Sequence, residues 1–181
     1  SITIPESVTS IGGYTFFNCS SLTSITIPKG VISIGQWAFS DCSSLTNITI
    51  SEGVMSIGCS AFSGCSSLTS ITIPEGVVSI DNYAFAGCSS LTSMTIPESV
   101  TSIGYGVFSH CSSLENVYCK AIMPPVAKRI GYNWFTFDNN ASGRKIYVPM
   151  ESVEAYTTAD GWADYADSIV GYDFDNGVVV E

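Results

Sequence analysis

The sequence predicts a mainly β solenoid, in which short coils of chain stack on one another and a cap closes the C-terminal end. Two observations predict this fold. A 23-residue repeat returns five times over residues 1–118 without an insertion. Each copy also carries the alternating apolar and polar residues of a short strand, but it is too small to bury a core by itself. Stacked coils would share one continuous core.

Four columns of apolar residues define the repeat, and neighbours in each column are 23 residues apart. The columns are Ile11, Ile34, Ile57, Ile80 and Ile103; Phe16, Phe39, Phe62, Phe85 and Phe108; Cys19, Cys42, Cys65, Cys88 and Cys111; and Leu22, Leu45, Leu68, Leu91 and Leu114. A period that holds over five copies without drift indicates a repeat architecture.

Residues 22–42 show how one coil is built. The segment 25–27 (ITI) alternates and is rich in β-branched residues, as a strand prefers, and Pro28 then ends it. Gly35 suits a turn, and the apolar residues that follow every three positions favour short turns or 3₁₀ segments. The equivalent strands, about 4.8 Å apart in one parallel sheet, are expected at residues 2–4, 25–27, 48–50, 71–73, 94–96 and 117–119.

The period breaks after Cys119, and aromatic residues become dense. The aromatic residues in this part are Tyr132, Trp134, Phe135, Phe137, Tyr147, Tyr156, Trp162, Tyr165, Tyr172 and Phe174. Because the last coil of a solenoid needs cover, we expect residues 119–181 to form a cap.

The cap is expected to contain one or two short helices. A seventh strand is predicted at residues 145–149, where KIYVP repeats the strand pattern. Apolar spacing predicts helices at residues 151–158 and 162–169. We expect a loop at residues 138–143 and a frayed tail from Phe174 onward.

Charge excludes some classes of partner. The chain has 16 acidic and 6 basic residues, and Lys29 is the only basic residue before residue 119. Nucleic acid is not expected, because phosphate binding needs clustered lysine and arginine. Direct membrane insertion of this segment is not expected either, because no apolar run approaches the roughly 20 residues that cross a bilayer.

The repeated cysteine is predicted to be a buried apolar side chain. The Cβ atoms of equivalent cysteines in neighbouring coils would be about 4.8 Å apart. The two Cβ atoms of a disulfide are closer, at roughly 3.5–4.5 Å. A column spreads thiolates along a line, whereas a metal needs them around one point. A catalytic cysteine needs a base, and His110 is the only histidine. Cys119 should also be buried, and Cys59, outside the column, is a candidate exposed thiol.

No sequence motif points to an enzyme or a cofactor. The chain lacks H-E-x-x-H, G-x-S-x-G, a P-loop and a dinucleotide fingerprint. Residues 173–177 (DFDNG) resemble the start of a calcium loop, but the closing glutamate is missing. We therefore expect no catalysis, no metal and no cofactor.

The repeat resembles the BspA-like class of bacterial leucine-rich repeats. The resemblance covers residues 1–118 and rests on I-x-I-P followed by I-G-x-x-A-F-x-x-C, with single departures such as Ser51 for the proline and Asp81 for the glycine. It implies a right-handed leucine-rich-repeat solenoid with an aromatic-rich cap, located on a bacterial cell surface or secreted. BspA-like proteins are associated with adhesion to host extracellular proteins, such as fibronectin and fibrinogen, and with contacts to other bacteria.

Two sets of residues are candidate binding surfaces. The outward strand positions, which we call the front face, are Thr3, Ser24, Thr26, Asn47, Thr49, Ser70, Thr72, Ser93, Thr95 and Tyr118, with Ser1 and Asn116 at equivalent places. Leucine-rich repeats in general use this face for partners, although a ligand-free polar surface would have the same composition. The second set, the aromatic column, comprises Tyr14, Trp37, Tyr83 and, one place out of register, Tyr105. Such rings bind proteins or sugars, or pack between coils.

These features together predict a non-enzymatic binding module. The expected partner is a host extracellular-matrix or cell-surface protein, or another cell. Two alternatives stay open: a glycan-binding module that uses the aromatic column, and a passive spacer that displays another domain of a longer protein. Because Ser1 already lies inside the repeat pattern, we expect any signal or anchor to lie upstream.

Overall fold

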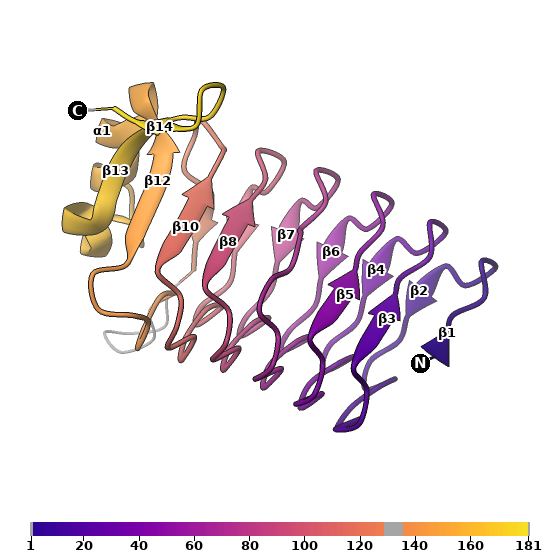
Figure 1. The fold of residues 1–181 in the computed structure, drawn as a ribbon. Helices are drawn as coiled ribbons and strands as arrows, with labels where there is room; N and C mark the ends of the chain where they lie inside the picture. Colours follow the sequence, from indigo (N-terminus) through magenta and orange to yellow (C-terminus); the bar gives the residue numbers. More distant parts are fainter. Residues whose placement is uncertain (1, 129–135, 181) are drawn as a thin grey trace.

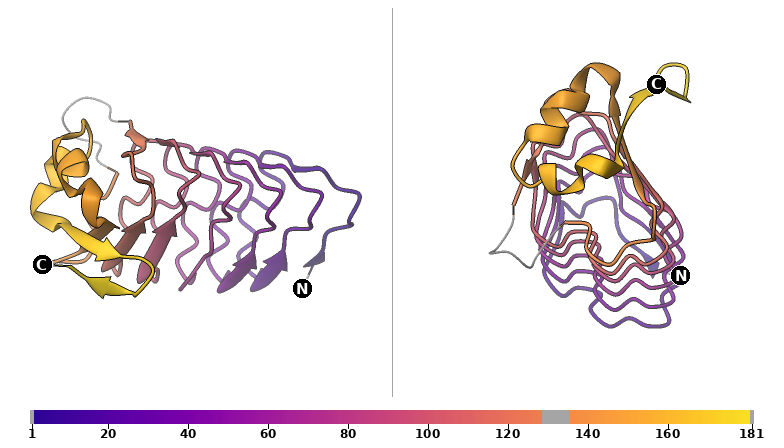
Figure 2. Two further views of the ribbon diagram at one scale, coloured as in Figure 1. Left: turned by 90° about the horizontal axis from the view of Figure 1, so that it is seen from above. Right: turned by 90° about the vertical axis from the view of Figure 1, so that its left-hand side faces the viewer.

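The computed structural model describes residues 2–128 and 136–180, which form a capped solenoid (Figure 1). Its coils lie side by side, and the end-on view shows them nested around one interior (Figure 2). The helices cover the C-terminal end, while the N-terminal coil lies at the opposite end. The predicted mainly β solenoid is confirmed. Ser1, Tyr132, Trp134 and Phe135 lie outside the described residues.

The strands of the repeated I-x-I segment line one side of the solenoid. They are β1 (Ile2–Thr3), β3 (Ser24–Thr26), β5 (Asn47–Thr49), β8 (Ser93–Ile96) and β10 (Asn116–Cys119), followed by β12 (Lys145–Pro149) and β13 (Ile169–Asp173). Neighbouring strands of this set are parallel and shifted by one repeat, so that Ile25 pairs with Ile48. The predicted strand at residues 145–149 is present as β12.

The front ladder is interrupted once, which corrects the expectation of a single sheet. Instead of a strand at residues 71–73, only Thr72 forms a bridge, to Thr95. β1-β3-β5 therefore form one sheet, and β8-β10-β12-β13 form another together with the tail strand β14 (Val178–Val179). The same two coils stay paired on the other side of the solenoid, where Ile57 pairs with Ile80 and the Asp81 amide donates to the Ile57 carbonyl at 2.9 Å. The interruption is therefore confined to the front ladder.

A second parallel sheet runs along another side of the solenoid, where the sequence predicts only turns. Its strands in the described residues are β2 (Ser10–Ile11), β4 (Ser33–Ile34), β6 (Ser56–Ile57), β7 (Ser79–Ile80), β9 (Ser102–Ile103) and β11 (Val126–Ala127). Each strand is two residues long, which is too short to show an alternating pattern. Stacking of equivalent coils, rather than local sequence, creates these pairs.

The phenylalanine column forms the centre of the core. Its rings stack from Phe16 to Phe108 with centroids 5.0 to 5.7 Å apart. Phe137 continues the stack at 5.4 Å from Phe108. The isoleucine and leucine columns are buried around these rings, so the repeated apolar positions build one continuous interior.

The predicted loop at residues 138–143 contains no helix or strand, and it forms the turns of a further coil. Phe137 continues the ring stack, and the Nδ2 of Asn140 donates to the Phe108 carbonyl at 2.7 Å. The Cys111 thiol makes the same bond to the coil before it, at 3.1 Å. Asn140 therefore stands in the cysteine position. The repeat is hidden in the sequence because Asn140 follows Cys111 by 29 positions rather than 23.

Three short helical segments cover the last coil: η1 (Met150–Ser152), α1 (Val153–Thr158) and η2 (Ala163–Ser168). The second predicted helix is a 3₁₀ helix, and Ile169 begins β13 instead of ending that helix. Two buried side chains join the helices to the preceding chain. The Tyr156 hydroxyl donates to the Ala121 carbonyl at 2.8 Å, and the Trp162 indole donates to the Pro125 carbonyl at 2.7 Å.

The tail forms a hairpin, although we expected it to be frayed from Phe174 onward. β14 (Val178–Val179) pairs antiparallel with β13. The Asp173 carboxylate holds the turn by accepting bonds from the amides of Asp175 and Asn176, at 3.0 and 2.9 Å, and from the Asn176 side chain at 2.7 Å. This local turn chemistry explains the order of the tail.

Candidate functional site

The front face is a ladder of polar side chains. Its exposed members are Thr3, Ser24, Thr26, Asn47, Thr49, Ser70, Thr72 and Ser93, while Thr95, Asn116 and Tyr118 are half-buried. Intervening residues such as Ile25 and Ile48 are buried, because successive side chains of a strand point to opposite faces. A shallow hollow of about 350 Å³ lies over the N-terminal part, where Thr26 and Thr49 line it.

The front face becomes aromatic at its C-terminal end. The rings of Tyr118 and Tyr147 stack at 4.8 Å, and Tyr172 packs against them at 5.4 and 5.3 Å. Phe174 contacts Tyr172 at 5.0 Å. We call these four half-buried residues the terminal aromatic cluster. Burial, together with the two neighbouring phenols, raises the pKa of Tyr118, so its hydroxyl stays protonated at neutral pH.

Sequence reasoning found only Tyr118 of this cluster. Tyr147 lies beside it because β10 pairs with β12, which brings together residues 118 and 147. The detectable signal was the repeated strand pattern at residues 145–149, which places Tyr147 at an outward position. Tyr172 and Phe174 could not be placed, because their strand and turn were not predicted.

The aromatic column forms two separate ring clusters in the structure. Tyr14 is 52% exposed and stacks on Trp37 at 6.2 Å, with Phe17 packed edge-on against both. Tyr83 and Tyr105 meet edge to face at 4.9 Å. The buried Ser60 occupies the equivalent position between Trp37 and Tyr83. Phe17, 44% exposed, was missed because its repeat position is otherwise polar or small.

Bulky residues of the aromatic column adopt a left-handed backbone, with φ of 60° at Tyr14, 58° at Trp37 and 56° at Tyr83. Glycine takes this position in the fifth coil, where the Tyr83 ring lies directly against Gly106. A left-handed conformation disfavours large side chains by about 1–2 kcal/mol. Contacts with the neighbouring coil offset this cost, so the rings take part in packing between coils.

The cysteine column lies in the core and is hydrogen-bonded. Cys42, Cys65, Cys88 and Cys111 are buried, and each thiol donates to a carbonyl of the preceding coil at 3.1 to 3.3 Å. Burial raises the pKa of Cys42 to about 11 and raises the pKa of Cys65 further. Cys42 and Cys65 are therefore neutral thiols at physiological pH.

The other three cysteines differ in how deeply they are buried. Cys119 is buried, as expected, and burial raises its pKa strongly. Cys19 is half-buried in the first coil. Cys59, the candidate exposed thiol, is also half-buried, because its sulfur lies 3.7 Å from the buried Ser60 hydroxyl. No disulfide occurs among the described residues.

Sites of other kinds are not formed by the described residues. Within residues 2–128 and 136–180, no group of three or more His, Cys, Asp or Glu side chains could hold a metal ion. The calcium-like segment at 173–177 is a turn, and its bonds from Asn176 and Asp175 lower the pKa of Asp173. None of the helices in this part of the chain has the length and hydropathy to span a membrane.

Comparisons with known proteins identify the repeat. A family model for the BspA type leucine rich repeat region matches in six copies, over residues 1–115 and 39–157. A leucine rich repeat protein of Treponema pallidum is 26% identical over 92% of this chain and 81% of its own, with a TM-score of 0.68. No curated protein matches the chain.

Two further structures show how far the likeness extends. A leucine rich cell surface protein of Faecalibacterium prausnitzii is 32% identical over 98% of this chain, with a TM-score of 0.65. The present chain spans 52% of that protein, about half its length. The pneumococcal vaccine antigen PcpA is 18% identical over 88% of this chain and 42% of its own, with a TM-score of 0.57, which shows a shared fold alone.

Proposed function

This chain belongs to the BspA-type leucine-rich repeat family, and we propose that it is a non-enzymatic binding module that holds a partner protein against its front face. The repeat protein from Faecalibacterium prausnitzii is described as a cell surface protein, which supports a location at the bacterial surface. The proposed role is adhesion, and the partner is a host extracellular-matrix or cell-surface protein, or a protein on another cell.

One observation carries this proposal: the front face is a long outward ladder that ends in the half-buried rings of the terminal aromatic cluster. Hydroxyl and amide groups such as Thr26, Asn47 and Thr49 stand in rows about 4.8 Å apart. Tyr118 and Tyr147 follow in the same rows. An extended surface of this kind suits a protein better than a small molecule, which needs an enclosing cavity. Tyrosine is also a frequent anchor in protein interfaces.

The test compares two triple variants that add the same charge to different sides of the solenoid. Thr26→Glu, Thr49→Glu and Thr72→Glu alter the front face. Ile32→Glu, Met55→Glu and Val78→Glu, at exposed positions beside the second sheet, form the matched control. Each protein is titrated against immobilised fibronectin, fibrinogen and a panel of other host surface proteins.

The proposal expects the wild type and the matched control to bind one of these proteins alike. The front-face variant should bind it at least about tenfold more weakly, because three carboxylates would be desolvated in the interface. Equal affinity of all three proteins would reject the front face as the binding surface. Failure of the wild type to bind any surface protein would reject the adhesive role.

Glycan binding is the second candidate, because Tyr14 and Trp37 stack in parallel and Tyr14 is 52% exposed. An exposed ring of this kind can stack on a sugar. A glycan array probed with the wild type and with Trp37→Ala decides this question. Hits that disappear in the variant support a glycan module, whereas a blank array removes it.

A passive spacer is the third reading of the same repeat. It is favoured if the longer protein that carries this segment places a catalytic or sugar-binding domain beside it, and if neither binding assay gives a signal. Specific binding to the isolated repeat segment would reject it.

A further inference from the structure

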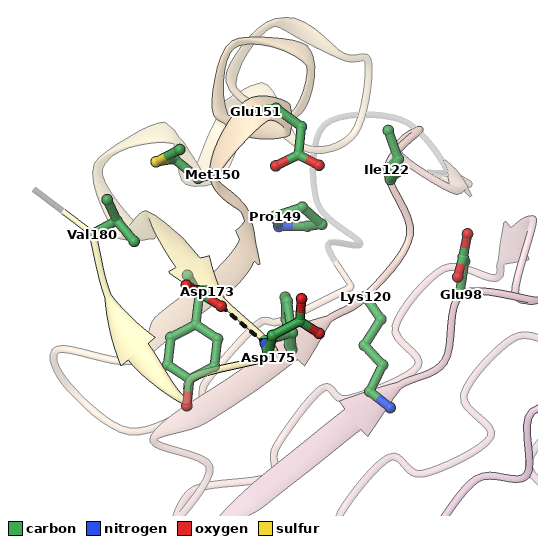
Figure 3. A pocket seen from close by; sticks show the side chains of 11 residues that line it. Glu98, Lys120, Ile122, Pro149, Met150, Glu151, Asp173, Asp175 and Val180 are labelled. Atoms are coloured by element: carbon green, nitrogen blue, oxygen red, sulfur yellow. Dashed lines mark hydrogen bonds between the residues drawn. The ribbon is translucent and has the colours of Figure 1, made fainter.

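A hollow of about 660 Å³ opens at the C-terminal end of the front face, between the ladder, the cap and the tail hairpin (Figure 3). Its apolar wall comes from segments far apart in the sequence: Ile122, Pro149, Met150, Tyr172, Phe174 and Val180. This volume lies within the range of about 300–1,000 Å³ that is typical of small-ligand sites. The hollow lies at the edge of the proposed interface.

The polar wall of the hollow is strongly acidic. Glu98, Glu151, Asp173 and Asp175 line it, against a single lysine, Lys120. The Lys120 ammonium is 3.1 Å from a Glu75 carboxylate oxygen, so its charge is already compensated. In the view of Figure 3, Glu151 and Asp175 turn their carboxylates toward the middle of the hollow.

Three of these carboxylates are available to a ligand. Glu98, Glu151 and Asp175 are exposed, and among residues 2–128 and 136–180 no hydrogen bond or ion pair engages their carboxylates. Asp173 differs, because its oxygens accept the bonds that hold the hairpin turn. Because these free carboxylates are negatively charged, the hollow favours a positively charged ligand.

The aromatic wall of the hollow indicates which kind of cation would fit. Tyr172 and Phe174 belong both to the hollow and to the terminal aromatic cluster, and their rings lie 5.0 Å apart, edge to face. Aromatic ring faces attract guanidinium and ammonium groups. Arginine and lysine side chains combine an apolar stem with a cationic head, which matches a site with apolar, aromatic and acidic walls.

We propose that this hollow is a pocket for an arginine or lysine side chain of the partner protein that lies across the front face. The inference rests on the proposed protein-binding function and specifies its partner: an exposed, basic, extended segment. The terminal aromatic cluster covers the segment beside the pocket, and Glu98, Glu151 and Asp175 receive the cationic head.

The experiment uses a defined probe, a fluorescein-labelled decapeptide of alternating arginine and glycine. The same peptide with citrulline in place of arginine keeps the shape and removes the charge. Fluorescence anisotropy at low salt measures binding to the wild type and to two triple variants. Glu98→Gln, Glu151→Gln and Asp175→Asn alter the pocket, whereas Asp41→Asn, Glu154→Gln and Asp167→Asn remove the same charge from exposed positions elsewhere.

The wild type should bind the arginine peptide and not the citrulline peptide. The pocket variant should lose about tenfold in affinity, and the matched variant less than about twofold. Equal losses in both variants would show attraction by net charge alone and would overturn the pocket. The pocket is also overturned if millimolar calcium chloride raises the melting temperature of the wild type but not of the pocket variant, because the carboxylates would then hold a metal ion.

This experiment separates the pocket from the proposed function. If the pocket variant binds the peptide like the wild type while the front-face variant loses a host protein, the pocket is wrong and the binding module stands. If peptide binding depends on the pocket but no surface protein responds to the front-face variant, the pocket stands and the proposed interface is wrong. Unchanged melting temperatures in both triple variants confirm that they are folded.

Discussion

At the scale of single residues, the repeated cysteine is a buried group that also donates a hydrogen bond. The thiol of Cys65 donates to the carbonyl of Phe39, and Cys88 and Cys111 repeat this bond one and two coils later. The sequence predicted burial from the spacing of the column, but not the bond. The bond depends on the backbone of the preceding coil, which no local pattern describes.

Thiol reactivity in the native state should follow burial. Cys19 and Cys59, which are half-buried, should react with a thiol reagent within minutes. The buried group should react only on unfolding: Cys42, Cys65, Cys88, Cys111 and Cys119. Measurement with Ellman's reagent, before and after addition of denaturant, checks this difference. Rapid reaction of more than two thiols in the native protein would contradict a buried column.

Alkaline pH should destabilise the protein through the same thiols. A thiol in the unfolded chain has a pKa near 9.0, and burial raises the pKa of Cys42 to about 11 in the folded chain. Stability is therefore complete below pH 9 and falls as the pH rises, since the unfolded state then releases protons more readily. The expected loss at pH 10 is about 1.4 kcal/mol for Cys42, and Cys65, whose pKa is also raised by burial, adds a similar amount. Urea unfolding at pH 8 and pH 10 measures it.

The control for this effect is a variant with fewer buried thiols. Cys65→Ala and Cys88→Ala together should lower stability at pH 8 by leaving cavities. The further loss between pH 8 and pH 10 should nevertheless be smaller than in the wild type. An unchanged pH dependence would mean that other groups cause the alkaline destabilisation.

At the scale of elements, the strands with the repeated alternating pattern were the predictable part. Alternation predicts β3, β5, β8 and β10 within one residue at their N-terminal ends. The second sheet was missed, because a two-residue strand such as Ser56–Ile57 has no period to detect. The last coil was missed, because an altered spacing and Asn140 hid the repeat. The tail hairpin depends on the side chain of Asp173 rather than on a pattern.

The phenylalanine stack provides a test of the continuous core. Phe62→Ala removes a fully buried ring between Phe39 and Phe85, whose rings lie 5.3 and 5.4 Å away. The free energy of unfolding should fall by about 3–5 kcal/mol, because neighbouring coils cannot collapse into the cavity. Chemical denaturation monitored by tryptophan fluorescence measures it.

Phe16→Ala is the matched control for the stack. Phe16 is half-buried and has one stacked neighbour, Phe39 at 5.0 Å. Phe16→Ala should lower the free energy of unfolding by roughly half as much as Phe62→Ala or less, since less apolar area is lost from the core. Equal costs at both positions would contradict a stack whose interior rings are more constrained than its end.

At the scale of the whole molecule, the cap is joined to the solenoid by buried hydrogen bonds. Tyr156→Phe removes the hydroxyl that donates to the Ala121 carbonyl and keeps the ring. An unpaired buried carbonyl costs about 1–3 kcal/mol, so the melting temperature should fall by roughly 3–10 °C. Tyr14→Phe removes a hydroxyl from an exposed ring and should leave the melting temperature unchanged. Equal melting temperatures of both variants would show that this bond does not hold the cap.

The candidate interface was predictable only in part, and for a physical reason. Strand periodicity placed Thr26, Thr49 and Tyr118 on one outward face. The terminal aromatic cluster and its acidic hollow depend on the pairing of β10, β12 and β13, and the tail hairpin supplies Phe174 and Asp175. The paired residues Ile146 and Ile169 are 23 positions apart, and Glu98 and Asp175 of the hollow are 77 apart. Contacts over such separations are set by the whole fold, so local patterns cannot show them.

Hydroxyl-radical footprinting of the complex with a host partner protein tests the front face most directly, because it needs no substitution. Tyrosine and methionine are both readily oxidised, so native residues can report on two sides of the solenoid. We expect the partner to protect Tyr118 and Tyr147 on the front face, while Met55, which is 56% exposed beside the second sheet, stays as reactive as in the unbound protein. Protection of Met55 with unchanged oxidation of the two tyrosines would contradict the proposed interface.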